Sequence, residues 1–179
     1  MKVDHESLGR TLVFIGFMGV GKTTVGELVA DRLDVPFKDS DEEIVKAFDE
    51  MTIPEIFHTY GEQAFRNKEK ETILQLIDAE KQVLSLGGGA FMQEAVRQKC
   101  LEEAVVIFLD MTFAAWKERF PELISSRPLL QTKSMAEIET LFAERRSLYD
   151  AHHIRVLTDE ITPEEAAEQI FQSLEKLDR

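Results

Sequence analysis

The residues from Gly16 to Thr23 form the phosphate-binding pattern G-x-x-x-x-G-K-[ST], here Gly-Phe-Met-Gly-Val-Gly-Lys-Thr. Glycines in such a loop let backbone N–H groups turn inward towards an anion, and a following helix adds the positive end of its dipole. The lysine, Lys22, reaches the β- and γ-phosphates of a nucleoside triphosphate, and the Thr23 hydroxyl can bind Mg²⁺. The expected contacts to the nucleotide are Gly19, Val20, Gly21, Lys22, Thr23 and Thr24.

The flanking residues supply the elements that this loop needs. Residues 11–15 are apolar and β-branched, as in a buried strand, and apolar residues recur on one face of a helix predicted over 22–33. Strand, glycine loop and helix in this order argue against a chance match. The motif therefore predicts a nucleotide site, but it leaves the acceptor of the phosphoryl group open.

Two further groups follow predicted strands. Asp39 and Asp41 come after a strand at about 35–37, and Gly87–Gly89 follows a strand at 82–86. Ligands of parallel sheets bind at the carboxyl ends of the strands, so both groups are expected beside the glycine loop. Two acids that cap a helix, and a plain turn, are the alternatives. Three successive glycines cost backbone entropy, which favours close approach of a ligand over a plain turn.

An arginine in an apolar stripe is the next candidate. In the helix predicted over 135–150, Arg145 falls within the stripe, whereas Arg146 points about 100° away and is expected to face water. A buried arginine requires an anion, although one at the rim of the core can also reach water. The stripe comprises Ile138, Leu141, Phe142, Leu148 and Tyr149.

A second charged pair lies on the helix predicted over 62–79. Glu69 falls within its apolar stripe, and Arg66 flanks the stripe three residues away. The pair is either a structural ion pair or an arginine that Glu69 holds towards an anionic substrate. With a net charge of −13, the protein must concentrate its basic residues wherever it binds an anion.

Residues 121–134 are polar and without periodicity, which predicts a loop that acts as a lid. Arg127 within it can close over the transferring phosphoryl group, as arginine fingers do. Arg119, near the start of the lid, is a candidate contact to the nucleotide. Ordinary solvated arginines are the alternative for both.

Composition excludes several functional classes. The length of 179 residues predicts one domain over 1–179, with a loose tail at 1–9. The net negative charge argues against nucleic acid as a partner. No apolar run approaches the ~20 residues of a membrane span. A polar N-terminus and the single cysteine, Cys100, favour the cytoplasm, and the four histidines lack metal-ligand spacing.

Strands and helices alternate along the chain, which predicts an α/β fold with a largely parallel sheet. Capping boxes are predicted to begin at Ser40, Thr52 and Thr162. The strands are predicted at 11–15, 35–37, 82–86, 104–109 and 154–157. The helices are predicted at 22–33, 41–48, 53–59, 62–79, 92–100, 112–120, 135–150 and 163–177.

The order of the motifs is more specific than any of them alone. It runs from the glycine loop through Asp39–Asp41, the segment Gly61–Arg66, Gly87–Gly89 and Arg127–Leu130 to Arg145, four residues before Tyr149. This ordered set resembles the shikimate kinase family from about residue 11 to 175. The resemblance implies a three-layer P-loop kinase fold whose five-stranded parallel sheet has the order 2-3-1-4-5. It also implies transfer of the ATP γ-phosphoryl group to the 3-hydroxyl of shikimate, in aromatic amino-acid biosynthesis.

The resemblance also implies a role for each motif residue. Arg66 and Arg145 would take the shikimate carboxylate, and Asp41 its hydroxyls, beside Gly87, Gly88 and Gly89. Thr23 and, through water, Asp39 would hold Mg²⁺, while Lys22 and Arg127 would neutralise the transferring phosphoryl group and Arg119 would stack on adenine. Asp41 lies in the first turn of a predicted helix, whose dipole stabilises the carboxylate and makes it a poor base. We therefore expect Asp41 to orient the hydroxyl and to accept its proton late.

Two other functions remain open on sequence grounds. One is a kinase of another small acceptor, such as gluconate or a nucleoside monophosphate; the arginine pair favours a carboxylate. The other is a nucleotide-binding regulator that has lost catalysis. The expected partners are ATP and shikimate, with no nucleic acid and no membrane, and the expected state is a monomer.

Overall fold

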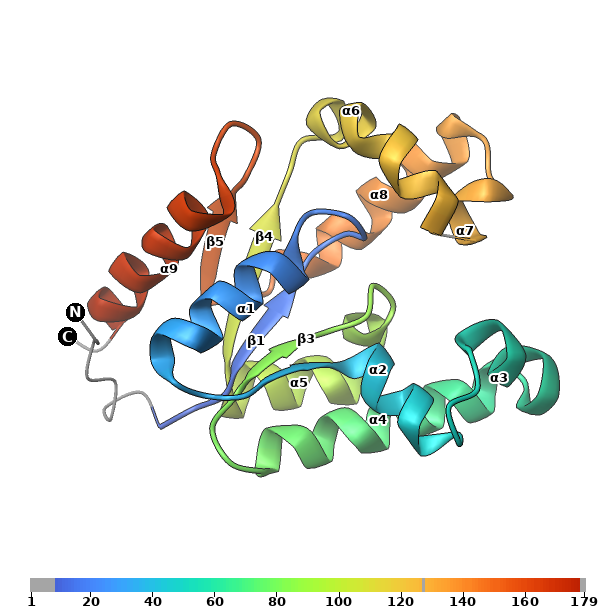
Figure 1. Ribbon diagram of the computed structural model, residues 1–179, viewed down its shortest axis with the longest axis horizontal. Helices are drawn as coiled ribbons and strands as arrows, with labels where there is room; N and C mark the ends of the chain where they lie inside the picture. Colours follow the sequence, from blue (N-terminus) through green and yellow to red (C-terminus); the bar gives the residue numbers. More distant parts are fainter. Residues whose placement is uncertain (1–8, 127, 178–179) are drawn as a thin grey trace.

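A computed structural model describes residues 9–126 and 128–177 of the chain (Figure 1). Its five strands form one parallel sheet in the order β2-β3-β1-β4-β5, which confirms the predicted order. β1 lies at the centre and every one of its residues is buried, as expected for a strand covered on both faces. The strands are β1 (Leu12–Ile15), β2 (Phe37–Asp39), β3 (Val83–Ser85), β4 (Val105–Asp110) and β5 (Ile154–Leu157).

Helices cover both faces of the sheet and make three layers (Figure 1). On one face, Leu12 and Phe14 of β1 pack in a cluster with α1 and α9. On the other face, Val13 and Ile15 pack with α4 and α5. The alternation follows from the period of two in a strand. The helices are α1 (Lys22–Leu33), α2 (Ser40–Ala47), α3 (Ile53–Tyr60), α4 (Glu62–Asp78), α5 (Glu94–Glu103), α6 (Phe113–Leu123), α7 (Pro128–Gln131), α8 (Met135–Tyr149) and α9 (Pro163–Leu177), with 3₁₀ turns η1 (Ala90–Met92) and η2 (Ile124–Ser126).

The second strand lies two residues later than predicted. The N–H of Val35 donates to the carbonyl of Ala30 in α1, so Val35 still belongs to the turn that ends the helix. Pro36 has no N–H to donate, and its carbonyl accepts from Val83 at the start of β3. Pairing with β3 therefore begins at Phe37, which carries the strand directly into Asp39.

The predicted capping box at Ser40 is wrong. Asp39 caps α2, because its Oδ1 accepts from the N–H groups of Asp41 at 2.9 Å and Glu42 at 3.4 Å. The Ser40 hydroxyl instead accepts from the N–H of Gly87 at 2.9 Å. The boxes at Thr52 and Thr162 are confirmed, each with reciprocal bonds to the glutamate three residues later.

The prediction of an irregular loop over 121–134 is also wrong. α6 continues through Pro121 to Leu123, and η2 and α7 fill most of the remainder. Pro121 removes one backbone hydrogen bond from α6, and the helix ends two residues later. The described part of the chain contains no helix long and apolar enough to cross a membrane.

Candidate active site

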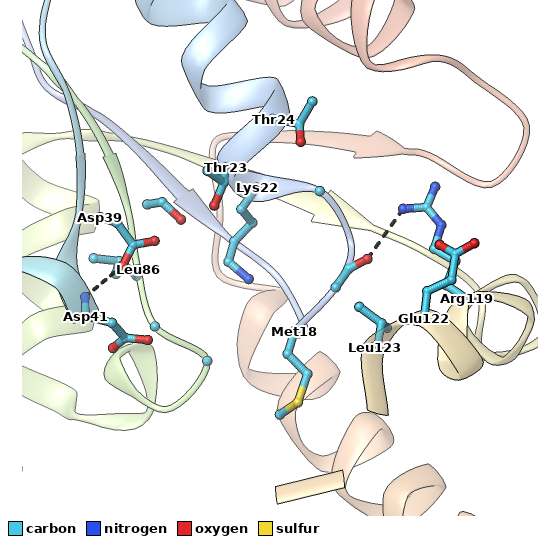
Figure 2. Close-up of a pocket in the computed structure, with 15 residues that line it drawn as sticks. Met18, Lys22, Thr23, Thr24, Asp39, Asp41, Leu86, Arg119, Glu122 and Leu123 are labelled. Carbon is cyan, nitrogen blue, oxygen red and sulfur yellow. Dashed lines mark hydrogen bonds between the residues drawn. The ribbon is translucent and has the colours of Figure 1, made fainter. Parts of the chain in front are cut away.

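The carboxyl ends of β1, β2 and β3 open into a cavity of about 350 Å³ (Figure 2). Lys22 and Thr23 enter it from the start of α1, and Asp39 and Asp41 from the junction of β2 and α2. Arg119 and Glu122 of α6 line the far wall. The structure thus brings the phosphate loop and the acidic pair together, as the sequence predicted. The lining residues are Met18, Gly19, Gly21, Lys22, Thr23, Thr24, Asp39, Asp41, Ser85, Leu86, Gly87, Gly88, Arg119, Glu122 and Leu123.

The loop presents its backbone donors to this cavity. Gly21 precedes α1 with φ of 101°, a conformation that glycine adopts without strain, and no side chain caps the helix. The first N–H groups of α1 are therefore left to bind an anion, and no acidic residue lies in the first turn to repel one. The Lys22 ammonium folds back over the loop and donates to the carbonyls of Gly16 at 2.7 Å and Phe17 at 3.2 Å.

Trp116 of α6 supports the loop, a role that sequence reasoning missed. Its indole N–H donates to the carbonyl of Met18 at 2.8 Å, and its ring lies 5.4 Å from that of Phe17. The side chain is 0% exposed. The signal in the sequence was only a single tryptophan, and nothing indicated that it would contact a loop 98 residues away.

A second cavity of about 220 Å³ adjoins the first. Both are lined by Met18, Asp41, Gly87 and Gly88. The second cavity adds Arg66, Arg145 and a wall of apolar side chains from the helices beside β2. Its other lining residues are Ile53, Phe57, Phe65, Glu69 and Gly89.

The three glycines each face a different polar side chain of the site. A Cβ on Gly87 would collide with the Asp41 carboxylate, and one on Gly88 would lie 2.7 Å from Nη1 of Arg145. A Cβ on Gly89 would lie 2.8 Å from Nη1 of Arg66. The triple glycine predicted close approach of a ligand or another backbone; in the structure, side chains of the site make the close approach.

Arg66 is held by a buried acceptor, Glu69. Its Nη1 donates to Oε2 of Glu69 at 2.7 Å, and the same oxygen accepts from the Gln93 amide at 2.8 Å. Glu69 is 1% exposed. The predicted pairing of Arg66 with Glu69 is confirmed, and Gln93 is a partner that the sequence did not reveal.

Arg145 is held in a different way. Its guanidinium lies 5.8 Å from the ring of Phe17, and no described carboxylate lies within salt-bridge distance of it. Burial, and then the positive charge of Arg66, lower the pKa of Arg145, against the opposing effects of Tyr149 and Glu69. Two guanidinium groups that face one small cavity favour an anionic ligand, because such a ligand removes their repulsion.

The prediction that Arg146 points away from the apolar stripe towards water is confirmed only in part, because Arg146 also has a buried partner. Its guanidinium makes two hydrogen bonds to the Asp110 carboxylate, at 3.0 and 2.8 Å, although the side chain remains 43% exposed. Leu148 was expected in the apolar face of α8 and is exposed. Periodicity gave the direction of Arg146 but could not find a partner that is distant in sequence.

The structure describes only some of the remaining candidate residues. Arg119 lies at the first cavity and donates to the carbonyl of Gly19 at 3.4 Å (Figure 2). Arg127 lies outside the described residues. Within the described ranges, no cluster of three or more histidine, cysteine or acidic side chains is arranged to hold a metal ion. Thr23 and Asp39 nevertheless offer oxygen donors to the same cavity.

Comparison with known proteins agrees with this geometry. The family model described as "Shikimate kinase" matches residues 18–175. The shikimate kinase of Bacillus subtilis (strain 168) is 49% identical over 166 residues, which cover 92% of this chain and 89% of the relative.

Two solved structures are similar over nearly their full length. Shikimate kinase from Aquifex aeolicus is 35% identical with a TM-score of 0.79, covering 93% of this chain and 97% of that one. Shikimate kinase from Acinetobacter baumannii, solved in complex with shikimate, is 31% identical with a TM-score of 0.85 and covers 94% of both chains. On these similarities, the chain belongs to the shikimate kinase family.

Proposed function

We propose that this protein transfers the γ-phosphoryl group of ATP to the 3-hydroxyl of shikimate, giving ADP and shikimate 3-phosphate. The observation that carries the proposal is the junction of two cavities at Asp41, Gly87 and Gly88. One cavity contains the phosphate loop, and the other contains two arginines. A phosphoryl donor and a small carboxylate-bearing acceptor would therefore meet beside Asp41.

The acceptor side fits a hydroxylated carboxylate. Arg66 and Arg145 together offer planar donor groups that match a carboxylate in geometry and charge. The apolar side chains of Ile53, Phe57 and Phe65 provide a surface for a carbon ring. Asp41, between the cavities, would accept a hydrogen bond from the hydroxyl that is phosphorylated.

The donor side fits ATP with Mg²⁺. The Thr23 hydroxyl and the Asp39 carboxylate are the hard oxygen donors that Mg²⁺ prefers, with phosphate oxygens and water completing its shell. One Asp39 oxygen caps α2, which fixes the orientation of the carboxylate. When bound, Mg²⁺ would neutralise charge on the β- and γ-phosphates.

The protein's own contribution to the chemical step is mostly electrostatic. Lys22 would leave the loop carbonyls and follow the charge that develops on the transferring group, and Arg127 would add a second positive charge. Asp41 would hold the hydroxyl in line and accept its proton late, because a loose transition state needs little early deprotonation. We propose a monomeric enzyme in the cytoplasm, where the free, buried Cys100 would stay reduced.

A coupled assay of ADP release tests the proposal. With ATP, Mg²⁺ and shikimate, we expect turnover of about 1–100 s⁻¹, the ordinary range of kinases. Gluconate and nucleoside monophosphates should give only background release. Background release with shikimate as well would contradict the proposal and favour a nucleotide-binding regulator.

Asp41→Asn separates orientation from proton transfer. Asparagine keeps the hydrogen-bonding shape but cannot take a proton. Because the proton leaves late in a loose transition state, we expect kcat to fall by less than the ~10²-fold at which general-base contributions begin. The shikimate KM should change only a few-fold. Single-turnover kinetics with saturating shikimate measure this. A variant that keeps kcat would show that Asp41 has no essential catalytic role.

A further inference from the structure

A buried carboxylate outside both cavities joins three elements of the fold. Asp110, the last residue of β4, is 1% exposed. Its Oδ1 accepts from the N–H of Met111 at 2.9 Å and from Nε of Arg146 at 3.0 Å. Its Oδ2 accepts from Nη2 of Arg146 at 2.8 Å and from two guanidinium nitrogens of Arg155, at 2.9 and 2.5 Å. One carboxylate thereby connects β4 with α8 and with β5.

The charges in this cluster hold one another in place. Burial raises the pKa of Asp110, but hydrogen bonds from Arg146 and Arg155 outweigh it and hold that pKa below its ordinary value. The bond to Asp110 raises the pKa of Arg146. Such buried ion clusters seldom add more stability than apolar side chains would, and their best-attested benefit is to fix one arrangement. The arrangement fixed here is the packing position of α8 against the end of β4.

The position of α8 matters for the second cavity because α8 also carries Arg145, the residue before Arg146. Arg145 faces Arg66 across the second cavity, and repulsion from Arg66 contributes to its lowered pKa. Arg66 is held by Glu69, but Arg145 has no described carboxylate within salt-bridge distance. Its position therefore depends on the helix that carries it. On the cavity side, that helix is attached by the Tyr149 hydroxyl, which donates to the carbonyl of Gly88 at 3.0 Å.

We propose that Arg146 is a positioning residue for Arg145: its two-point bond to Asp110 holds α8 at the rotation and height that place the Arg145 guanidinium beside Gly88. Tyr149 and Arg146 fix the C-terminal half of α8 from two directions, and Arg145 directly precedes Arg146 in this half of the helix. The inference rests on the proposed function, because it assigns Arg145 to the acceptor. It adds a residue that need not touch either substrate.

Arg146→Met removes the bond and keeps an unbranched side chain. We expect the shikimate KM and dissociation constant to rise about tenfold, the equivalent of one misplaced interaction. kcat at saturating shikimate and the KM for ATP should change less than about twofold, because the phosphate loop is not attached to Asp110. Arg146→Lys keeps the charge but loses the two-point geometry, and it should raise the shikimate KM roughly threefold. The lysine variant also covers the case in which the methionine variant does not fold.

Two further variants separate positioning from general stability. Arg155→Met also removes an arginine from Asp110, but not one on α8, so it should lower the melting temperature without moving the shikimate KM. Arg32→Met removes an arginine from a surface pair with Glu168, far from the site. It should change neither the KM for shikimate nor the KM for ATP. An unchanged shikimate KM in both folded Arg146 variants would overturn the positioning role. So would a parallel rise in both KM values. Wild-type turnover of shikimate tests the proposed function separately, so that either idea can fail alone.

Discussion

Lys22→Ala is expected to lower kcat at least ~10²-fold, as loss of a single donor to transition-state charge does elsewhere. The reason is geometric. The Lys22 ammonium bonds to the carbonyls of Gly16 and Phe17, directly over the loop whose N–H groups would hold the phosphates. A short movement takes it from these carbonyls to the transferring group.

The measurement is kcat in the coupled assay, with ATP and shikimate both saturating. Lys176→Ala is the matched control, because Lys176 is an exposed lysine near the end of α9. It should retain full activity. The folded state of the Lys22 variant is checked by its melting temperature, which we expect to change little, since the hydrogen bonds of Lys22 to the loop are made to two backbone carbonyls. Near-normal turnover by a folded Lys22→Ala protein would remove Lys22 from the mechanism.

Arg145→Met should give the second large effect, a rise of at least ~30-fold in the shikimate dissociation constant. Truncating one partner of a buried charge pair costs about 2–5 kcal/mol, and about 1.4 kcal/mol is tenfold in affinity. The stability effect should have the opposite sign. Burial and the facing Arg66 both disfavour the Arg145 charge in the free protein, so an apolar side chain should leave the melting temperature unchanged or raise it.

The adjacent residue provides the comparison. Arg146→Met should lower the melting temperature, because it leaves the buried Asp110 with a single arginine, and should weaken shikimate binding less. The same substitution at two successive positions is thus expected to shift stability and affinity in different proportions. Calorimetric titration with shikimate and thermal unfolding measure both quantities. Equal losses of affinity at the two positions would contradict the assignment of Arg145 to the acceptor.

Local signals in the sequence were sufficient for the phosphate loop and for the glycines. The loop needs only neighbouring residues, and its strand and helix lie next to it in the chain. Arg145 was found because helical periodicity relates residues three and four apart. The sheet order came from the resemblance to a family rather than from the residues, and the structure confirms it.

The errors at Ser40 and Arg146 share a physical cause, which is competition from distant partners. Ser40 has the side chain of a helix cap, but Gly87, 47 residues away, donates to its hydroxyl and leaves the cap to Asp39. Arg146 is directed away from the core, yet Asp110 lies 36 residues earlier at the end of β4. None of these contacts leaves a trace in local spacing.

The packing of Trp116 makes the phosphate loop visible to spectroscopy. The protein has one tryptophan, and its indole bonds to the loop carbonyl of Met18 and contacts the Phe17 ring. Its intrinsic emission therefore responds to changes in this loop, without a label and without background from other indoles. Nucleotide that rearranges this loop should change the emission even in variants that no longer turn over. The affinity for ATP can then be measured in Lys22→Ala and Asp41→Asn from the change in tryptophan fluorescence rather than from product formation.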